Sequence, residues 1–109
     1  MSKNKGQLEK QIREILAKDE RSRNSDIRLT HCLWITYYRK YFKMIDGHWH
    51  VDIQAMYDLP REDNIKRIRA KIQNDLHEFL PTDPEVARKR GWEIDEWRQY
   101  LGYPTGDTL

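Results

Sequence analysis

Aliphatic residues at helical spacing mark a first helix over residues 7–20. Leu8, Ile12, Ile15 and Leu16 stand at i, i+4, i+7 and i+8, so they form one narrow apolar stripe on an otherwise polar helix. Leaving four aliphatic side chains exposed would forfeit several kcal/mol at roughly 25 cal/mol per Å². We therefore expect this stripe to be buried, either on its own domain or in a two-fold dimer.

The next region combines a long apolar helix with shorter elements. A helix is predicted over 26–43, because its second half, "LWITYYRKYF", is apolar or aromatic on nearly every side, as in a central helix. Asp46 and Gly47 mark a turn, and "HWHV" at 48–51 alternates like a short strand or an extended connector. Residues 52–59 predict a short helix. Candidate N-caps of the long helix are Asn24, Ser25 and Asp26.

The stretch "PREDNIKRIRAKIQ" predicts a further helix over residues 60–75. Proline suits a first helical turn, and Glu62 and Asp63 follow where the helix dipole favours carboxylates. Arg69 and Gln73 fall at one edge of the apolar side. The core-facing residues share an arc of about 80° at 100° per residue and comprise Ile65, Ile68, Ile72 and Leu76.

The opposite side of this helix is mostly basic or amide-bearing, with the small Ala70 at its middle. Lys and Arg bind phosphates or guanine edges, Asn and Gln can read adenine, and a small central residue allows close approach to DNA. The pattern is typical of a recognition helix, with Asp63 as the acidic exception. The candidate DNA-binding residues are Arg61, Asn64, Lys66, Arg67, Ala70, Lys71 and Asn74.

Two compact helices are predicted near the C-terminal end. In "TDPEVARKRG", Asp83 is placed as N-cap, Pro84 as first helical residue and Gly91 after the last turn. "EIDEWRQYLG" follows in the same style, with a buried stripe of Ile94, Trp97 and Leu101.

A long helix, a short helix, a proline-bearing turn and a basic amphipathic helix follow one another in the order of a helix-turn-helix, including winged forms. Residues 24–103 resemble small phage and prophage helix-turn-helix proteins in the segments "LPREDNIKRIRAKIQ", "FLPTDPEVARKR" and "EWRQYLGY". This resemblance implies DNA binding in a phage-like setting. After Asn74 the chain continues with a Leu/Phe/Pro stretch and more helix, where a winged form would have a glycine-turned hairpin.

Charge is distributed unevenly, although the net charge of the 109-residue chain is only +2. Residues 1–43 carry eleven Lys or Arg and five Asp or Glu, whereas residues 44–60 carry three Asp and no Lys or Arg. Regional positive charge fits a polyanion-binding surface, and a mixed-charge solvated surface equally well. The chain contains no apolar run of signal-peptide or membrane-spanning length, so we expect a cytoplasmic protein of a bacterium or a phage-infected host, with no membrane partner.

Two other function classes have a sequence feature of their own. His48, His50 and Asp52 would share one face of a strand, and His31 could join them in the metal site of a nuclease, but their spacing matches no known ligand pattern. The apolar stripe of the 7–20 helix could instead bind a host protein or a second copy of the chain. The sequence has no Gly-rich phosphate loop and no nucleophile elbow, so catalysis, a cofactor and a metal are not expected.

These features together predict a mainly α protein, built as a helix-turn-helix or winged-helix-like domain with little or no β, plus an N-terminal amphipathic helix. The expected organisation is a helix and linker over 1–23, the domain over 24–103 and a flexible tail over 104–109. The predicted function is non-catalytic binding of duplex DNA. The alternative is a protein-interaction module that binds and redirects a host or phage protein.

Overall fold

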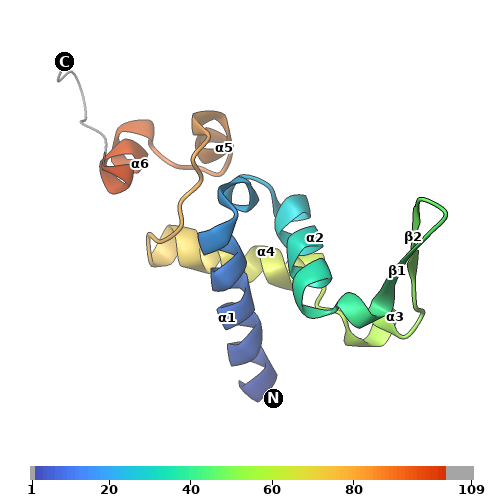
Figure 1. The fold of residues 1–109 in the computed structure, drawn as a ribbon. Coiled ribbons are helices and arrows are strands. Elements are labelled where there is room, and N and C mark those ends of the chain that lie inside the picture. Colours follow the sequence, from blue (N-terminus) through green and yellow to red (C-terminus); the bar gives the residue numbers. More distant parts are fainter. Residues whose placement is uncertain (1, 103–109) are drawn as a thin grey trace.

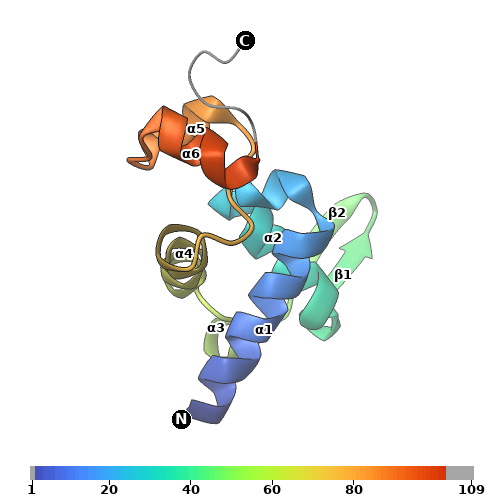
Figure 2. The ribbon, with the colours of Figure 1, turned by 90° about the vertical axis from the view of Figure 1, so that its left-hand side faces the viewer.

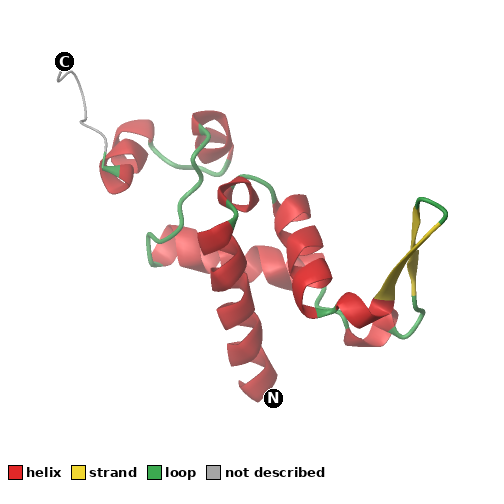
Figure 3. Ribbon diagram, viewed as in Figure 1, coloured by secondary structure: helices red, strands yellow, loops and turns green. Residues whose placement is uncertain are grey.

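A computed structural model of the chain describes residues 2–102 and is mainly helical, with one two-stranded antiparallel sheet (Figures 1 and 3). The α-helices are α1 (Ser2–Lys18), α2 (Asp26–Tyr37), α3 (Ala55–Asp58), α4 (Glu62–Ala70), α5 (Pro84–Lys89) and α6 (Ile94–Leu101). The other elements are the 3₁₀ turns η1 (Glu20–Arg23) and η2 (Arg39–Tyr41), the strands β1 (Phe42–Ile45) and β2 (His48–Val51), and the π-helical turn η3 (Lys71–Asp75). The mainly α expectation is confirmed, and the tail expected over 104–109 lies outside the described residues. None of the helices between residues 2 and 102 has the length and apolar character that crossing a membrane requires.

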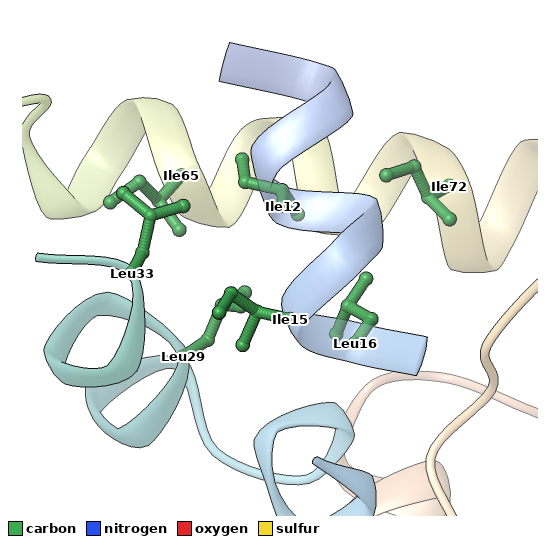
Figure 4. Packing of buried hydrophobic residues seen from close by; sticks show 7 residues of the cluster. All are labelled: Ile12, Ile15, Leu16, Leu29, Leu33, Ile65 and Ile72. Carbon is green, nitrogen blue, oxygen red and sulfur yellow. The ribbon is translucent and has the colours of Figure 1, made fainter. Parts of the chain in front are cut away.

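The core forms where α1, α2 and α4 meet (Figure 4). Its fully or almost fully buried members are Ile12, Ile15, Leu16, Leu29, Leu33, Ile65 and Ile72. The apolar stripe of α1 is therefore buried on its own chain, as the first of the two expected arrangements requires, with Leu8 partly buried at its edge. This burial removes the stripe as a surface for a second copy or a host protein. It also means that α1 and the domain expected over 24–103 share one core.

The long apolar helix is shorter than its composition predicted. α2 ends at Tyr37, because Tyr38 leaves the helical conformation (φ −127°, ψ 31°). Residues 42–43, expected to be helical, instead begin β1. The aromatic Phe42 and the β-branched Ile45 suit a strand, and pairing with β2 satisfies the backbone there.

Residues 48–51, which the sequence left open between a short strand and an extended connector, form β2, the second strand of a hairpin. Phe42 lies opposite Val51, and Ile45 lies opposite His48, so that two residues remain for the turn. Asp46 and Gly47 both have positive φ (50° and 80°), as a two-residue type I′ hairpin turn requires. The sheet is therefore small, and it precedes α4 in the chain instead of following it.

The three candidate N-caps of α2 have three different roles. The Ser25 side chain is the actual cap and accepts a hydrogen bond from the backbone N–H of Arg28 at 3.2 Å. Asn24 instead accepts one from the backbone N–H of Thr82 at 2.8 Å, and so joins α2 to the segment before α5. Asp26 pairs with a residue of α4, as described below.

The helix predicted over 60–75 is confirmed as α4 and its continuation η3, except that it begins at Glu62. Arg61 holds the N-cap position, so Pro60 lies in the turn before the helix and not in its first turn. Ile65 and Ile72 are fully buried and Ile68 is partly buried against the same cluster, in agreement with the predicted stripe. Leu76 is the exception, with 44% of its surface exposed. It closes the π-helical turn by a hydrogen bond to the Lys71 carbonyl (3.2 Å), and this wider turn moves it off the stripe where the helix ends.

The two C-terminal helices pack on each other in a second, smaller cluster. Asp83 caps α5 as predicted, accepting a hydrogen bond from the backbone N–H of Glu85 at 2.9 Å. Trp97 is buried and donates its indole N–H to the Pro81 carbonyl at 2.8 Å. The molecule measures 53 × 36 × 21 Å, with the hairpin and the α5–α6 pair at opposite ends (Figure 1).

Candidate nucleic-acid interface

α4 is attached to the rest of the protein along one side only. Figure 2 shows it nearly end-on, with α1 and α2 on one side of it. Ile65 and Ile72 bind that side to the core. The turn before the helix is fixed as well, because the indole N–H of Trp34 on α2 donates to the Pro60 carbonyl at 2.9 Å. The side bearing the candidate DNA-binding residues is left to solvent.

A buried ion pair also fixes α4 to the start of α2. Arg69 donates from Nε to Oδ1 of Asp26 and from Nη2 to Oδ2, both at 2.8 Å. The Arg69 side chain is only 4% exposed, so this cation is neutralised inside the fold and is not available to a ligand. A two-point contact of this kind restricts both the position and the rotation of α4.

Gln73 extends this contact to the C-terminal segments. Its amide nitrogen donates to the carbonyls of Phe79 (2.8 Å) and Arg23 (3.2 Å), and its carbonyl oxygen accepts from Arg90 Nη1 at 3.0 Å. Arg90 Nη1 also donates to the Arg23 carbonyl at 2.7 Å. The fully buried glutamine is thus satisfied on both ends, which is the condition for burying an amide without loss of stability.

The charges of this cluster shift one another's protonation. Burial alone would raise the pKa of Asp26, but the Arg69 hydrogen bonds and the positive charges of Arg69, Arg90 and Lys66 outweigh it, and the pKa is lowered. Burial, followed by repulsion from Arg69, lowers the pKa of Arg90. Asp26 therefore stays ionised well into the acid range.

The structure places six of the seven candidate DNA-binding residues at the surface. Only Ala70 is partly buried. The exposed residues are Arg61, Asn64, Lys66, Arg67, Lys71 and Asn74. Among the described residues, no ion pair involves Lys66, Arg67 or Lys71. α4 and its junction with η3 therefore carry three cations that the fold itself does not neutralise, and Arg61 before the helix is a fourth.

Acidic residues at the start of α4 reduce this positive charge. Glu62 and Asp63 are exposed in the first turn, where the helix dipole favours them. The N-cap position is held by Arg61, which makes no capping hydrogen bond through its side chain. The Asp63 carboxylate is not the cap, so its charge remains on the same side of the helix as Arg67.

Three of the seven residues lie apart from the central group. Asn64 lines a cavity with Leu8 and Tyr38. Arg61 precedes the helix and lines an apolar cavity shared with Met56. Asn74 lies in η3 and lines a different cavity, together with His77 and Arg90. The residues that α4 and its junction with η3 bring together on the side away from Ile65 and Ile72 are Lys66, Arg67, Ala70 and Lys71.

Sequence reasoning did not identify Arg69 and Gln73 as the residues that position this surface. Their only signal was placement at the edge of the apolar arc, four residues apart. Their partners Asp26 and Arg23 are separated from them by 43 and 50 positions, and no local pattern links such distant positions.

The histidines considered for a metal site lie on the hairpin. His48 and His50 share one exposed face of β2, as expected for alternate residues of a strand. Within residues 2–102, no three His, Cys, Asp or Glu side chains come close enough to hold a metal ion. The hairpin geometry therefore adds no support to the nuclease alternative.

Comparison of the chain with family models, with curated proteins and with solved structures finds no match in any of the three. The resemblance of residues 24–103 to phage helix-turn-helix proteins thus remains an expectation from sequence motifs.

Proposed function

We propose that the protein binds duplex DNA through the exposed side of α4, without catalysis. One observation carries the proposal: Lys66, Arg67 and Lys71 are exposed and outside any ion pair of the described chain, on a helix whose other side is firmly held. A helix of this kind fits the major groove, where basic side chains reach phosphates and base edges.

In this proposal α3, the turn Leu59–Arg61 and α4 form the helix-turn-helix unit, with α4 as recognition helix. The hairpin β1–β2 precedes this unit in the chain, so it does not occupy the place of a usual wing. Phosphate contacts are assigned to Arg61, Lys66 and Lys71, and base contacts to Asn64, Arg67 and Asn74. The partly buried Ala70 leaves room for the helix to approach the groove floor.

The fixed position of α4 supports recognition rather than loose electrostatic association. Side chains can read base edges only if the helix that carries them has a defined position and rotation. The Arg69–Asp26 pair and the core residue Ile65 supply that restraint from the buried side. Since Arg69 is neutralised within the fold, the expected affinity depends on the three free cations and on Arg61.

The test is a titration of a labelled DNA duplex of about 20 base pairs by fluorescence anisotropy, over salt concentrations from about 50 to 200 mM. Wild-type affinity should fall as salt rises. Lys66→Ala and Lys71→Ala should each weaken binding to every duplex and reduce the salt slope by about 0.9, as loss of one phosphate contact does. Lys10→Ala is the matched control, because Lys10 is exposed on α1 and its loss changes the net charge equally.

The proposal fails if the wild-type protein shows no salt-dependent affinity for duplex DNA at low ionic strength. It also fails if Lys10→Ala changes the slope as much as the α4 substitutions, because net charge would then explain the binding. Circular dichroism melting curves should be the same for all four proteins, since each substituted lysine is exposed.

A further inference from the structure

The hairpin carries an apolar face that the DNA proposal does not use. Directly opposite residues of an antiparallel pair share one face, which places Phe42 with Val51 and Met44 with Trp49 on the same side. At the base of the hairpin, the Phe42 ring stacks on Trp34 of α2, with ring centroids 6.2 Å apart. Further out, this face is exposed.

α3 continues this face with further exposed apolar side chains. We define the hairpin–α3 surface by its exposed apolar members, which are Met44, Trp49, Val51, Ile53, Met56 and Tyr57. One cavity is lined by Trp49, Val51 and Trp34, and a second is lined by Val51, Trp34 and Met56. The two cavities share Val51 and Trp34, so the surface is continuous from the hairpin to α3.

We propose that a second copy of this chain docks on the hairpin–α3 surface. Six side chains of this size, at on the order of 100 Å² each, approach the roughly 800 Å² per partner that a standard interface buries. The six residues include no charge, and Met and aromatic residues are enriched at the centres of interfaces, with homodimer interfaces the most apolar. Charged residues line only the cavity beside Met56, where Arg61 and Glu62 have opposite signs, so the surface meets its own copy without net like-charge repulsion and offers little charge complementarity to a foreign partner.

The strand edges favour a copy of the same chain for a geometric reason. The Asp52 N–H donates to the Tyr41 carbonyl at 2.8 Å, so the alternating pattern directs the backbone groups of Met44 and Trp49 outward. In the described chain the sheet has only two strands, and neither outer edge is paired. Like edges can pair antiparallel about a two-fold axis, and a sheet of two strands is marginally stable alone.

Apart from Arg61, which lines the cavity beside Met56, this inference rests on residues other than those of the proposed DNA interface. Substitutions at Lys66 and Lys71 should leave self-association of the chain unchanged. Loss of self-association should leave the contribution of each α4 cation to the salt dependence of DNA binding unchanged. The two proposals can therefore fail separately.

The experiment measures the solution mass of the full chain by sedimentation equilibrium from about 1 to 100 µM, a range that detects micromolar affinity. Wild type should approach twice the monomer mass of 13.3 kDa as concentration rises. Met44→Glu should raise the dimer dissociation constant at least about 10-fold. Ile45→Glu is the control, since Ile45 is 45% exposed against 54% for Met44 but lies on the opposite face of the same strand.

Met56→Glu provides a second variant, on α3. Met56 is exposed and lies outside the hairpin, so this substitution does not disturb the folding of the hairpin. It should weaken the dimer like Met44→Glu, with an unchanged melting curve of the monomer. A wild-type protein that stays monomeric over the whole range overturns the proposal. The proposal is also overturned if a dimer forms but Ile45→Glu weakens it as much as Met44→Glu while Met56→Glu has no effect, because the contact would then lie elsewhere on the hairpin.

Discussion

Arg69 and Asp26 are separated by 43 positions and form a two-point ion pair between α4 and the first turn of α2, with both N–O distances at 2.8 Å. The Arg69 side chain is almost completely buried. The pair lies at the edge of the buried side of α4, and Lys66 is the nearest of the exposed cations, since its charge acts on Asp26. Together with the core residue Ile65, it fixes the position and rotation of α4 relative to α2.

Removal of one partner of this pair should destabilise the protein strongly. Arg69→Met keeps the helical propensity and much of the volume but leaves the Asp26 carboxylate without its main partner, so we expect a loss of about 3 kcal/mol. Arg88→Met is the control, because the Arg88–Glu85 pair is exposed and should contribute under about 0.5 kcal/mol. Urea unfolding measures both, and equal losses would show that burial of the pair is unimportant.

Ile72 and Leu76 both fall in the apolar arc of an ideal helix, but the π-helical turn between them predicts that they contribute unequally to stability. Ile72 is fully buried and Leu76 is not. Ile72→Ala should therefore cost about 2–5 kcal/mol of unfolding free energy, and Leu76→Ala less than about 1 kcal/mol. If both substitutions cost the same in chemical denaturation, η3 does not displace Leu76 from the core.

Arg67 is expected to contribute specificity. It is exposed near the middle of the α4 surface, where a guanidinium can bond a guanine edge at two points. Arg67→Ala should cost about 1–3 kcal/mol on a preferred site and little on random duplex, so the ratio of the two affinities should fall. A selection from random duplexes supplies the preferred site, and an unchanged ratio would assign Arg67 to phosphate contact only.

Asp63 should oppose DNA binding, because its carboxylate is exposed on the side of α4 that carries the cations. Asp63→Asn removes one negative charge and should strengthen binding by about 0.5–1 kcal/mol at low salt. Asp95→Asn makes the same change in net charge at an exposed position of α6 and should have a much smaller effect. Anisotropy titrations compare the two, and an equal gain from both would argue against α4 as the contact surface.

Acid should destabilise the fold through two carboxylates. A hydrogen bond from Arg28 lowers the pKa of Asp19, and the pKa of Asp26 is lowered despite its burial by its arginine partners. A carboxyl whose pKa is lower in the folded state stabilises above its unfolded value of 3.8, and this contribution disappears as pH falls through the folded pKa. Thermal melts should therefore show falling stability below about pH 5, with a shallower decline in Asp26→Asn.

The hairpin shows how far local patterns determine structure. The alternation of "HWHV" and the Asp46–Gly47 turn were visible in the sequence, and both are confirmed. The partner strand was not, because Phe42 ends an aromatic-rich run that fits a helix as well as a strand. Cross-strand pairing decided between the two, and pairing is a property of two segments together.

The sequence alone determined the helices and the polarity of their sides. Spacing placed Ile65 and Ile72 in the core and left Lys66, Arg67 and Lys71 outside, because helical periodicity is local. Only the tertiary structure decided that the α1 stripe is buried on its own chain and that Arg69 is neutralised by Asp26. The physical reason is that burial and ion pairing depend on which distant segments meet, and a periodic pattern carries no information about its partner.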